Sequence, residues 1–342
     1  MPIDPAERRP LGRTGLTVTP LGFGGAPIGG LYRPVVEDEA IGVVRRAWDL
    51  GIRLFDTAPL YGYGASERRV GAGLADRPRD AFVLSTKVGR LVAEVGRIPP
   101  GAEIDRQVLD GREDGAYAGT EGRKVLFDYS GDGVRRSIDE SLRRLRLDRI
   151  DIALIHDPDR HWAAAIGETY PTLARLREEG TIRAIGAGMN QSAMLARFAR
   201  EGDFDVFLLA GRYTLLDHDA LAELLPTCVE RGIAVLIGGV MNSGILADPR
   251  AGSRFNYEAA PAQLVARAER LAAVCQRHGV DLKAAAIQFP LAHPAVSAVL
   301  AGVRSIPHLE EYPRLFRAAI PAELWSELRA EGLIPPEAPT PS

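Results

Sequence analysis

The chain has 342 residues, 46% of them hydrophobic, a formal net charge of −3 and two cysteines, Cys228 and Cys275. It has no basic block that would indicate nucleic-acid binding, and the cysteines show neither metal-ligand nor redox spacing, which fits a reducing cytosol. The sequence opens without a signal-peptide pattern, and no apolar run reaches the roughly 18 residues that a membrane helix needs. We therefore expect a soluble, cytoplasmic protein.

The first half of the chain alternates strand and helix patterns. Residues 11–19, with Gly12 and Gly15 as turn residues, predict a short hairpin ahead of the first strand. The apolar runs and helical spacings that follow predict strands at 20–25, 52–56, 82–88 and 150–156, and helices at 37–50, 66–75 and 133–145.

The second half continues the alternation, with strands predicted at 182–186, 206–209, 233–237 and 296–300, and helices at 163–179, 191–200, 220–231, 262–277 and 282–292. Eight strands alternating with helices predict an α/β protein with a (β/α)₈ TIM barrel. We expect one domain over residues 1–342, with a core at about 11–330. The Pro-rich residues 335–342 are expected to form a loose tail.

A long loop after the third strand interrupts this pattern. Residues 89–129 are rich in glycine and charge and have no clear periodicity. A connection this long is usually functional or disordered. Because it follows the third strand, we expect it to lie over the barrel mouth as a substrate lid. An ordinary mobile surface insertion is the alternative.

Polar residues follow three predicted strands. Asp56 ends one strand and Tyr61 follows on a Gly- and Pro-containing loop, Lys87 lies within the next strand, and His156 ends another. Lysine is rarely buried unless it is paired, and Asp56 is its natural partner if the two strands are neighbours. Taken singly, Asp56 and Tyr61 also fit a strand-end cap and a surface tyrosine.

The four residues together can move a proton to or from a carbonyl oxygen. A free tyrosine has a pKa near 10, and a close ammonium would lower it by stabilising the phenolate. Tyr61 would then be the general acid or base, with Asp56 holding Lys87 and with His156 donating a hydrogen bond to the substrate oxygen. Nothing else in the chain supplies a reductant, so a cofactor must carry the hydride.

This set resembles the catalytic tetrad of the aldo-keto reductase family, and the resemblance extends from residue 11 to about residue 314. It implies a nicotinamide dinucleotide bound across the barrel mouth without a Rossmann domain. Consistent with that, the run from Gly22 to Pro27 lacks the third glycine of a dinucleotide fingerprint. No metal is expected, because His156 and His161 lie five residues apart, the wrong spacing for two ligands on one helix face.

The resemblance also implies the cofactor-binding residues. Asn190 would bind the nicotinamide carboxamide, although it could instead cap the next helix. The glycine-rich run after the seventh strand would approach the pyrophosphate, although any glycine-rich turn looks similar. Arg304 would bind a 2′-phosphate and Glu311 the adenine, with a surface charge at a helix start as the alternative for Arg304. The predicted set is Gly24, Asn190, Tyr213, Gly238, Asn242, Ser243, Gly244, Leu246, Gly302, Arg304, His308 and Glu311.

Three positions depart from the family pattern. Ala210 stands where many relatives carry a carboxamide-binding glutamine, and Gly238 where many carry an aromatic residue that stacks on the nicotinamide. Tyr213 could supply an aromatic wall instead. His308 stands where NADPH-specific members often carry arginine or glutamine, so we expect use of both NADP and NAD with a lean toward NADP.

The runs at 210–217 and 238–244 resemble the sugar-oxidising branch of the family. That branch includes L-fucose and D-threo-aldose 1-dehydrogenases, and pyridoxal 4-dehydrogenase is similar. The resemblance implies oxidation of an aldose such as L-fucose or D-arabinose at C1 to the lactone, with Tyr61 as general base. The alternatives are NADPH-dependent reduction of aldehydes and ketones, pyridoxal 4-dehydrogenation and a non-enzymatic cofactor-sensing subunit. The expected partner is a small carbonyl or sugar substrate.

Overall fold

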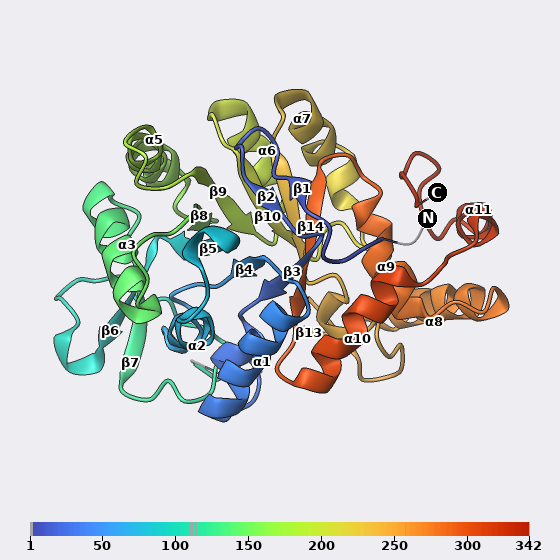
Figure 1. Cartoon of the computed structure of the whole chain (residues 1–342), viewed down its shortest axis with the longest axis horizontal. Helices are drawn as coiled ribbons and strands as arrows, with labels where there is room; N and C mark the ends of the chain where they lie inside the picture. The colour runs from blue at the N-terminus through green and yellow to red at the C-terminus, as the bar shows by residue number, and fades with distance from the viewer. Residues whose placement is uncertain (1–2, 110–111, 114, 257, 342) are drawn as a thin grey trace.

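Eight parallel strands close into one barrel, which confirms the predicted (β/α)₈ fold (Figure 1). The computed structural model describes residues 3–109, 112–113, 115–256 and 258–341. Both faces of these strands are buried, as expected for a parallel sheet covered by helices. Around the barrel the strands are β3 (Leu21–Gly24), β4 (Leu54–Asp56), β5 (Val83–Val88), β8 (Ile152–His156), β9 (Ala184–Met189), β10 (Val206–Ala210), β11 (Ala234–Gly238) and β14 (Val296–Gly302).

Amphipathic helices surround the barrel and bury their apolar stripes against the strands. They are α1 (Glu37–Asp49), α2 (Ala65–Leu74), α3 (Gly131–Leu145), α4 (Trp162–Ala164), α5 (Tyr170–Glu178), α6 (Ser192–Glu201), α7 (Leu224–Arg231), α8 (Ala262–Arg277), α9 (Leu282–Leu291), α10 (Ile306–Arg317) and α11 (Ala322–Ala330). A π-helical turn, η4 (Ala165–Thr169), joins α4 to α5 within the helix predicted at 163–179. No helix in the described ranges has the length and apolarity needed to cross a membrane.

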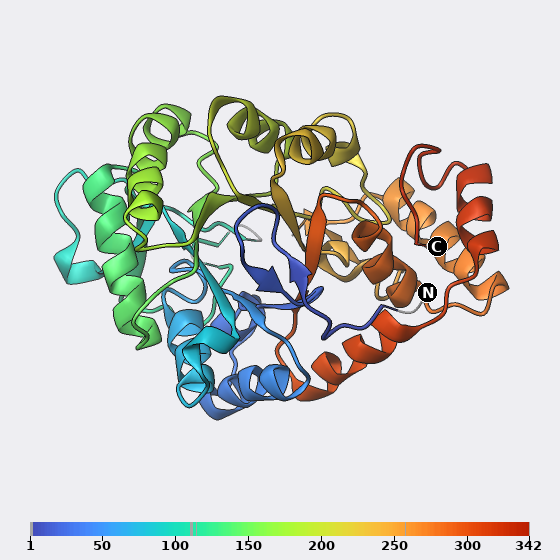
Figure 2. The same cartoon turned by 45° about the horizontal axis from the view of Figure 1, so that its top comes forward.

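The N-terminal hairpin closes one end of the barrel (Figure 2). Its strands, β1 (Arg9–Pro10) and β2 (Thr17–Val18), are antiparallel, as the turn residues predicted. Leu11, Leu16 and Val18 are at most 3% exposed and pack against the inward-facing side chains of the barrel strands. The hairpin therefore completes the apolar core at the amino ends of the strands.

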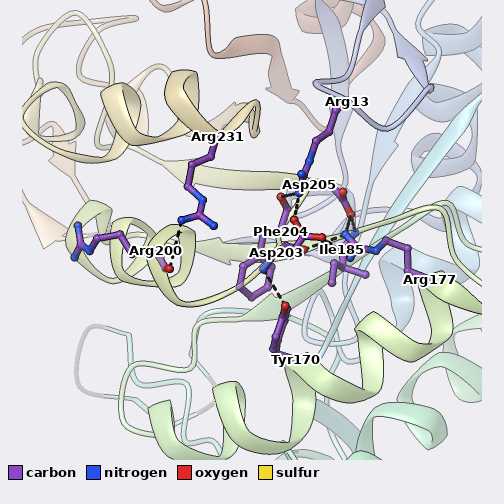
Figure 3. A network of polar contacts seen from close by, with 9 residues as sticks. All are labelled: Arg13, Tyr170, Arg177, Ile185, Arg200, Asp203, Phe204, Asp205 and Arg231. Atoms are coloured by element: carbon purple, nitrogen blue, oxygen red, sulfur yellow. Dashed lines mark hydrogen bonds and ion pairs between the residues drawn. The ribbon is translucent and has the colours of Figure 1, made fainter.

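A polar network ties this hairpin to the barrel (Figure 3). Asp205, just before β10, accepts hydrogen bonds from the Ile185 backbone N–H of β9 at 2.9 Å and from Arg177 Nη1 at 2.8 Å. Arg177 also donates to Asp203 at 2.9 Å, and Arg13 of the hairpin pairs with the same Asp203 carboxylate. These bonds fix two strand ends, a helix end and the hairpin relative to one another.

The lid, which we define as residues 89–129, contains more regular structure than its sequence predicts. β6 (Arg90–Glu94) and β7 (Arg123–Phe127) form an antiparallel hairpin beside α3 (Figure 1). The backbone of residues 103–105 adds to the outer side of β7, with Asp105 N donating to Val125 O at 2.8 Å. These strands were not predicted, because the sequence of the segment has no clear periodicity, and residues 110–111 and 114 lie outside the described ranges.

The expectation of a loose C-terminal tail is wrong. Ala338 is 1% exposed, and Arg329 of α11 donates to Ala338 O at 3.0 Å and to Thr340 Oγ1 at 2.9 Å. Leu333 and Ile334, which directly precede this segment, are buried in the core, and Arg267 of α8 donates to Leu333 O at 2.9 Å. The tail is held because Ala338 is buried and Arg329 donates hydrogen bonds to it. Ser342 lies outside the described ranges.

The close packing of α2 on α3 requires a residue without a Cβ atom at position 71, where the chain has Gly71. A Cβ at Gly71 would lie 1.9 Å from Leu145 O, whereas a Cβ at Gly42 in α1 would have no atom nearer than 3.9 Å. Gly71→Ala should lower the free energy of unfolding by about 1–3 kcal/mol or more, because backbone must move. Gly42→Ala, the matched control, should raise it by roughly 0.5–1 kcal/mol through helix propensity. Urea denaturation measures both, and equal effects would contradict the packing argument.

Candidate active site

A buried ion pair lies inside the barrel at the ends of β4 and β5. Lys87 is 1% exposed, and its Nζ donates to Asp56 Oδ2 at 2.8 Å and to Thr57 O at 2.9 Å. Ser85 Oγ donates to the other Asp56 oxygen at 2.9 Å. Burial raises the pKa of Asp56, and the Lys87 ammonium opposes that shift. The predicted pairing of Lys87 with Asp56 is confirmed.

Tyr61 and His156 meet at this pair. The Tyr61 ring lies on the loop after β4, with its centroid 4.6 Å from Lys87 Nζ and 5.8 Å from the His156 ring. Burial lowers the pKa of His156 well below its ordinary value, and the positive charges of Arg90 and Lys87 act in the same direction. The imidazole is therefore neutral near pH 7 and offers one N–H donor. The four predicted residues thus converge on one site at the carboxyl ends of the strands.

A cavity of about 250 Å³ opens beside these residues, with Tyr61, Lys87 and His156 in its wall. The lid supplies part of the opposite wall, and the Tyr117 ring stacks on the Tyr61 ring at a centroid distance of 6.2 Å. The expectation that the lid lies over the mouth is confirmed. The lid residues in the wall are Val108, Leu109, Ala116 and Tyr117.

Backbone hydrogen bonds fasten the lid across the mouth to the loop after β3. Tyr32 N donates to Ala116 O at 2.9 Å, and Ala118 N donates to Gly30 O at 3.1 Å. This short antiparallel ladder encloses the cavity from the side that faces β3. The lid therefore covers part of the mouth beside the four residues.

A second set of buried charges lies behind His156 and was not predicted from the sequence. Arg90, at the start of β6, donates to Asp105 Oδ2 and to the His156 carbonyl oxygen, both at 2.6 Å. Tyr129 also donates its hydroxyl to the His156 carbonyl at 2.6 Å. Asp157 Oδ2 lies 3.5 Å from Arg90 Nη1 and lines the cavity. The sequence signal for this set was the position of Arg90 just after β5 and of Asp157 just after β8.

The predicted cofactor residues lie on a different arc of the mouth from the tetrad. Asp56, Lys87 and His156 come from the adjacent strands β4, β5 and β8, whereas most of the cofactor set follows the adjacent strands β11, β14 and β3. Gly24 and Gly302 are paired residues at the ends of β3 and β14. The two arcs meet where β3 pairs with β4, so together they border the mouth of the barrel.

Arg304 is the cationic residue of this second arc. Its Nη1 is buried and has no hydrogen-bond partner among the described residues. Burial lowers the pKa of Arg304, and the positive charge of Arg33 acts in the same direction. A half-buried guanidinium next to a second arginine fits an anionic ligand group. His308 is exposed and lies four residues further along, in the first turn of α10.

Small residues lie at the ends of β10 and β11, at the mouth of the barrel. Ala210 and Gly238 are cross-strand partners at the ends of β10 and β11, and Ala210 lines the cavity together with Asn190. The absence of larger side chains there leaves room for a flat ring, so the residues present fit a nicotinamide. The helix-cap alternative for Asn190 is wrong, because Gln191 occupies the N-cap position of α6.

Some predicted cofactor residues already have protein partners. The Asn242 amide accepts from Thr214 Oγ1 at 2.6 Å and donates to Gly211 O at 3.1 Å. Glu311 pairs with Lys283. The other members of the glycine-rich run, Ser243, Gly244 and Leu246, follow Asn242, with Leu246 buried in the core.

Tyr213 does not line the cavity as the suggested aromatic wall would. It is fully buried and packs on Phe289 at a ring-centroid distance of 5.4 Å and on His293 at 5.6 Å. Its position in the core explains the aromatic residue at this place in the sequence.

The mouth of the barrel thus holds a buried Lys–Asp pair, a tyrosine and a neutral histidine, which are groups that can exchange a proton with a carbonyl or hydroxyl group. Residues 20–331 match the model of the Aldo/keto reductase family. The chain belongs to this family, and it is an oxidoreductase that uses a nicotinamide cofactor.

Named relatives cover nearly the whole chain. It is 46% identical to pyridoxal 4-dehydrogenase from Microbacterium luteolum, over 98% of this chain and 100% of the relative. It is 42% identical to D-threo-aldose 1-dehydrogenase from a Pseudomonas species, over 94% and 96%. Among solved structures it resembles the holo form of an aldo-keto reductase from Bacillus halodurans, with a TM-score of 0.73, 25% identity and coverage of 95% and 96%.

The neutral state of His156 makes stability depend on pH. The pKa of His156 is depressed in the folded protein, so below about pH 6.5 the unfolded chain binds a proton that the folded protein does not. His156 should therefore reduce stability as the pH falls below about 6.5, at up to roughly 1.4 kcal/mol per pH unit. His156→Asn should remove this contribution. Urea denaturation of both proteins between pH 7 and pH 5 measures it, and parallel pH profiles would contradict it.

Proposed function

We propose that this enzyme oxidises the cyclic hemiacetal form of an aldose, such as L-fucose or D-arabinose, at C1 to the lactone. The observation that carries the proposal is the Tyr61 ring 4.6 Å from the buried Lys87 ammonium, in the wall of a cavity shared with neutral His156. The 42% identity to a D-threo-aldose 1-dehydrogenase supports an aldose as the substrate.

The chain's own residues handle the proton. Tyr61 takes the proton of the anomeric hydroxyl, and the Lys87 ammonium stabilises the phenolate that accepts it. The neutral imidazole of His156 donates a hydrogen bond to the same substrate oxygen as it becomes a carbonyl oxygen. A nicotinamide dinucleotide, when bound, supplies the acceptor for the hydride that leaves C1.

Arg304 supports a preference for NADP over NAD. Its unpartnered Nη1 suits the 2′-phosphate that distinguishes the two cofactors. His308 and Glu311 would flank the adenosine end, and Asn190 would face the nicotinamide carboxamide.

Pyridoxal is the second candidate substrate. The 46% identity to a pyridoxal 4-dehydrogenase favours it. Pyridoxal also closes to a cyclic hemiacetal, because its hydroxymethyl group lies beside its aldehyde, so the same proton transfer serves both substrates.

The direct test follows absorbance at the reduced-nicotinamide band. L-fucose, D-arabinose and pyridoxal are each tested with NAD⁺ and NADP⁺, and simple aldehydes with NADPH. Oxidation of a sugar with NADP⁺ is the expected result. Oxidation of pyridoxal alone would select the second candidate, reduction alone would indicate an aldehyde reductase, and no response would favour a cofactor-sensing role.

The general-base assignment predicts the effect of Tyr61→Phe. This change keeps the ring and removes the hydroxyl, so turnover should fall by roughly 10²–10⁴ while the Kd of the cofactor hardly changes. Lys87→Met should act on the same step, so the losses should be far from additive in the double variant. Steady-state oxidation rates and cofactor titrations measure these effects. Near-normal turnover by Tyr61→Phe would refute the mechanism.

The cofactor assignment predicts the effect of Arg304→Ala. Loss of one charged hydrogen bond should weaken NADP binding by about ten- to a hundredfold and leave NAD binding nearly unchanged. Arg317→Ala, in the last turn of α10, the helix that begins just after Arg304, removes a charge paired with Asp4 and controls for the loss of charge alone. Fluorescence titration gives the dissociation constants, and equal losses for both cofactors would show that Arg304 does not bind the 2′-phosphate.

A further inference from the structure

Asp157 places a carboxylate in the cavity wall beside His156. Its Oδ2 lies 3.5 Å from His156 Nε2 and 3.5 Å from Arg90 Nη1, and its side chain is 26% exposed. It accepts no hydrogen bond on its carboxylate from any residue that the structure describes. A carboxylate has about four acceptor positions, so this one is available to a ligand in the cavity.

The backbone holds Asp157 in an unfavourable conformation. Its φ is +40°, in the left-handed region that non-glycine residues seldom adopt. Asp157 N donates to Gly188 O at 3.0 Å, and Tyr129 donates its hydroxyl to Asp157 O at 3.1 Å. Such strained residues persist where their surroundings fix them, and they concentrate at functional sites.

The positive charge of Arg90 partly balances the negative charge of the Asp157 carboxylate. Arg90 is 6% exposed and lies between Asp105 and Asp157, so it keeps Asp157 at the wall without forming a close pair with it. Burial raises the pKa of Asp157 to about 6, with Arg90 opposing the shift. The group is therefore mostly ionised near neutral pH, where a substrate hydroxyl would donate to it.

We propose that Asp157 is a substrate-specificity residue that accepts a hydrogen bond from the hydroxyl on the carbon next to the reacting carbon. This inference rests on the proposed function, because it assumes that the reacting oxygen is bound by Tyr61 and His156. With that oxygen at His156, Oδ2 of Asp157 lies within reach of a group one carbon–carbon bond away. The substrate class is then 2-hydroxy aldehydes and aldoses rather than simple aldehydes.

The test compares Asp157→Asn with the wild-type enzyme on two matched pairs of substrates. D-arabinose and 2-deoxy-D-ribose differ only in the 2-hydroxyl and are assayed for oxidation. Glyceraldehyde and 3-hydroxypropanal differ in the same way and are assayed for reduction. Asparagine keeps the shape of the side chain and tolerates positive φ, so the variant removes the charge with little change to the backbone.

The variant should lower the preference for the hydroxylated member, as a ratio of kcat/KM values, by about 5- to 30-fold. Asp159→Asn, an exposed carboxylate two residues further on, should change that ratio by less than about twofold. Equal losses on both members of a pair would overturn the role of Asp157. Reduction of glyceraldehyde without oxidation of either pentose would overturn the proposed aldose oxidation, and the glyceraldehyde pair would still decide the role of Asp157.

Discussion

The burial of the Lys87 ammonium against Asp56 is the constraint on which the site depends. Removing two charges from water costs several kcal/mol per ion, and an apolar pair of the same volume is often more stable. The barrel keeps the charged pair because neighbouring parallel strands deliver both groups at fixed register, with Asp56 opposite Ser85. In the proposed mechanism, this ammonium, 4.6 Å from the centroid of the Tyr61 ring, stabilises the phenolate that takes the substrate proton.

Arg90 connects the lid to the strand that carries His156. Arg90 begins β6, three residues after Lys87 in the sequence. It contacts the carbonyl of His156 on β8 and the carboxylate of Asp105 in the lid. Its charge also helps to keep the His156 imidazole neutral. The same guanidinium therefore anchors the lid and adds to the effect of burial that keeps His156 neutral.

The sequence predicted the eight strands and the meeting of the tetrad because each depends on local periodicity and on the general geometry of a parallel barrel. It did not predict the hairpin of the lid, since β6 and β7 are separated by residues 95–122 and recognise each other only in the folded chain. The docked tail depends on the burial of Ala338 and on hydrogen bonds from Arg329, which the Pro-rich composition does not indicate. Asp157 and Arg90 stand directly beside strand ends in the sequence, but the left-handed backbone of Asp157 and its 3.5 Å approach to Arg90 appear only in the folded chain.

The ladder between the lid and the loop after β3 consists of main-chain hydrogen bonds alone. Tyr32, Ala116 and Ala118 contribute their backbone groups to it, whatever side chains they carry. Mutation of the lid side chains that face the cavity therefore leaves the donors and acceptors of this ladder in place. An evolving or engineered enzyme could in this way acquire new substrates through the lid while the barrel and its proton-transfer residues stay the same.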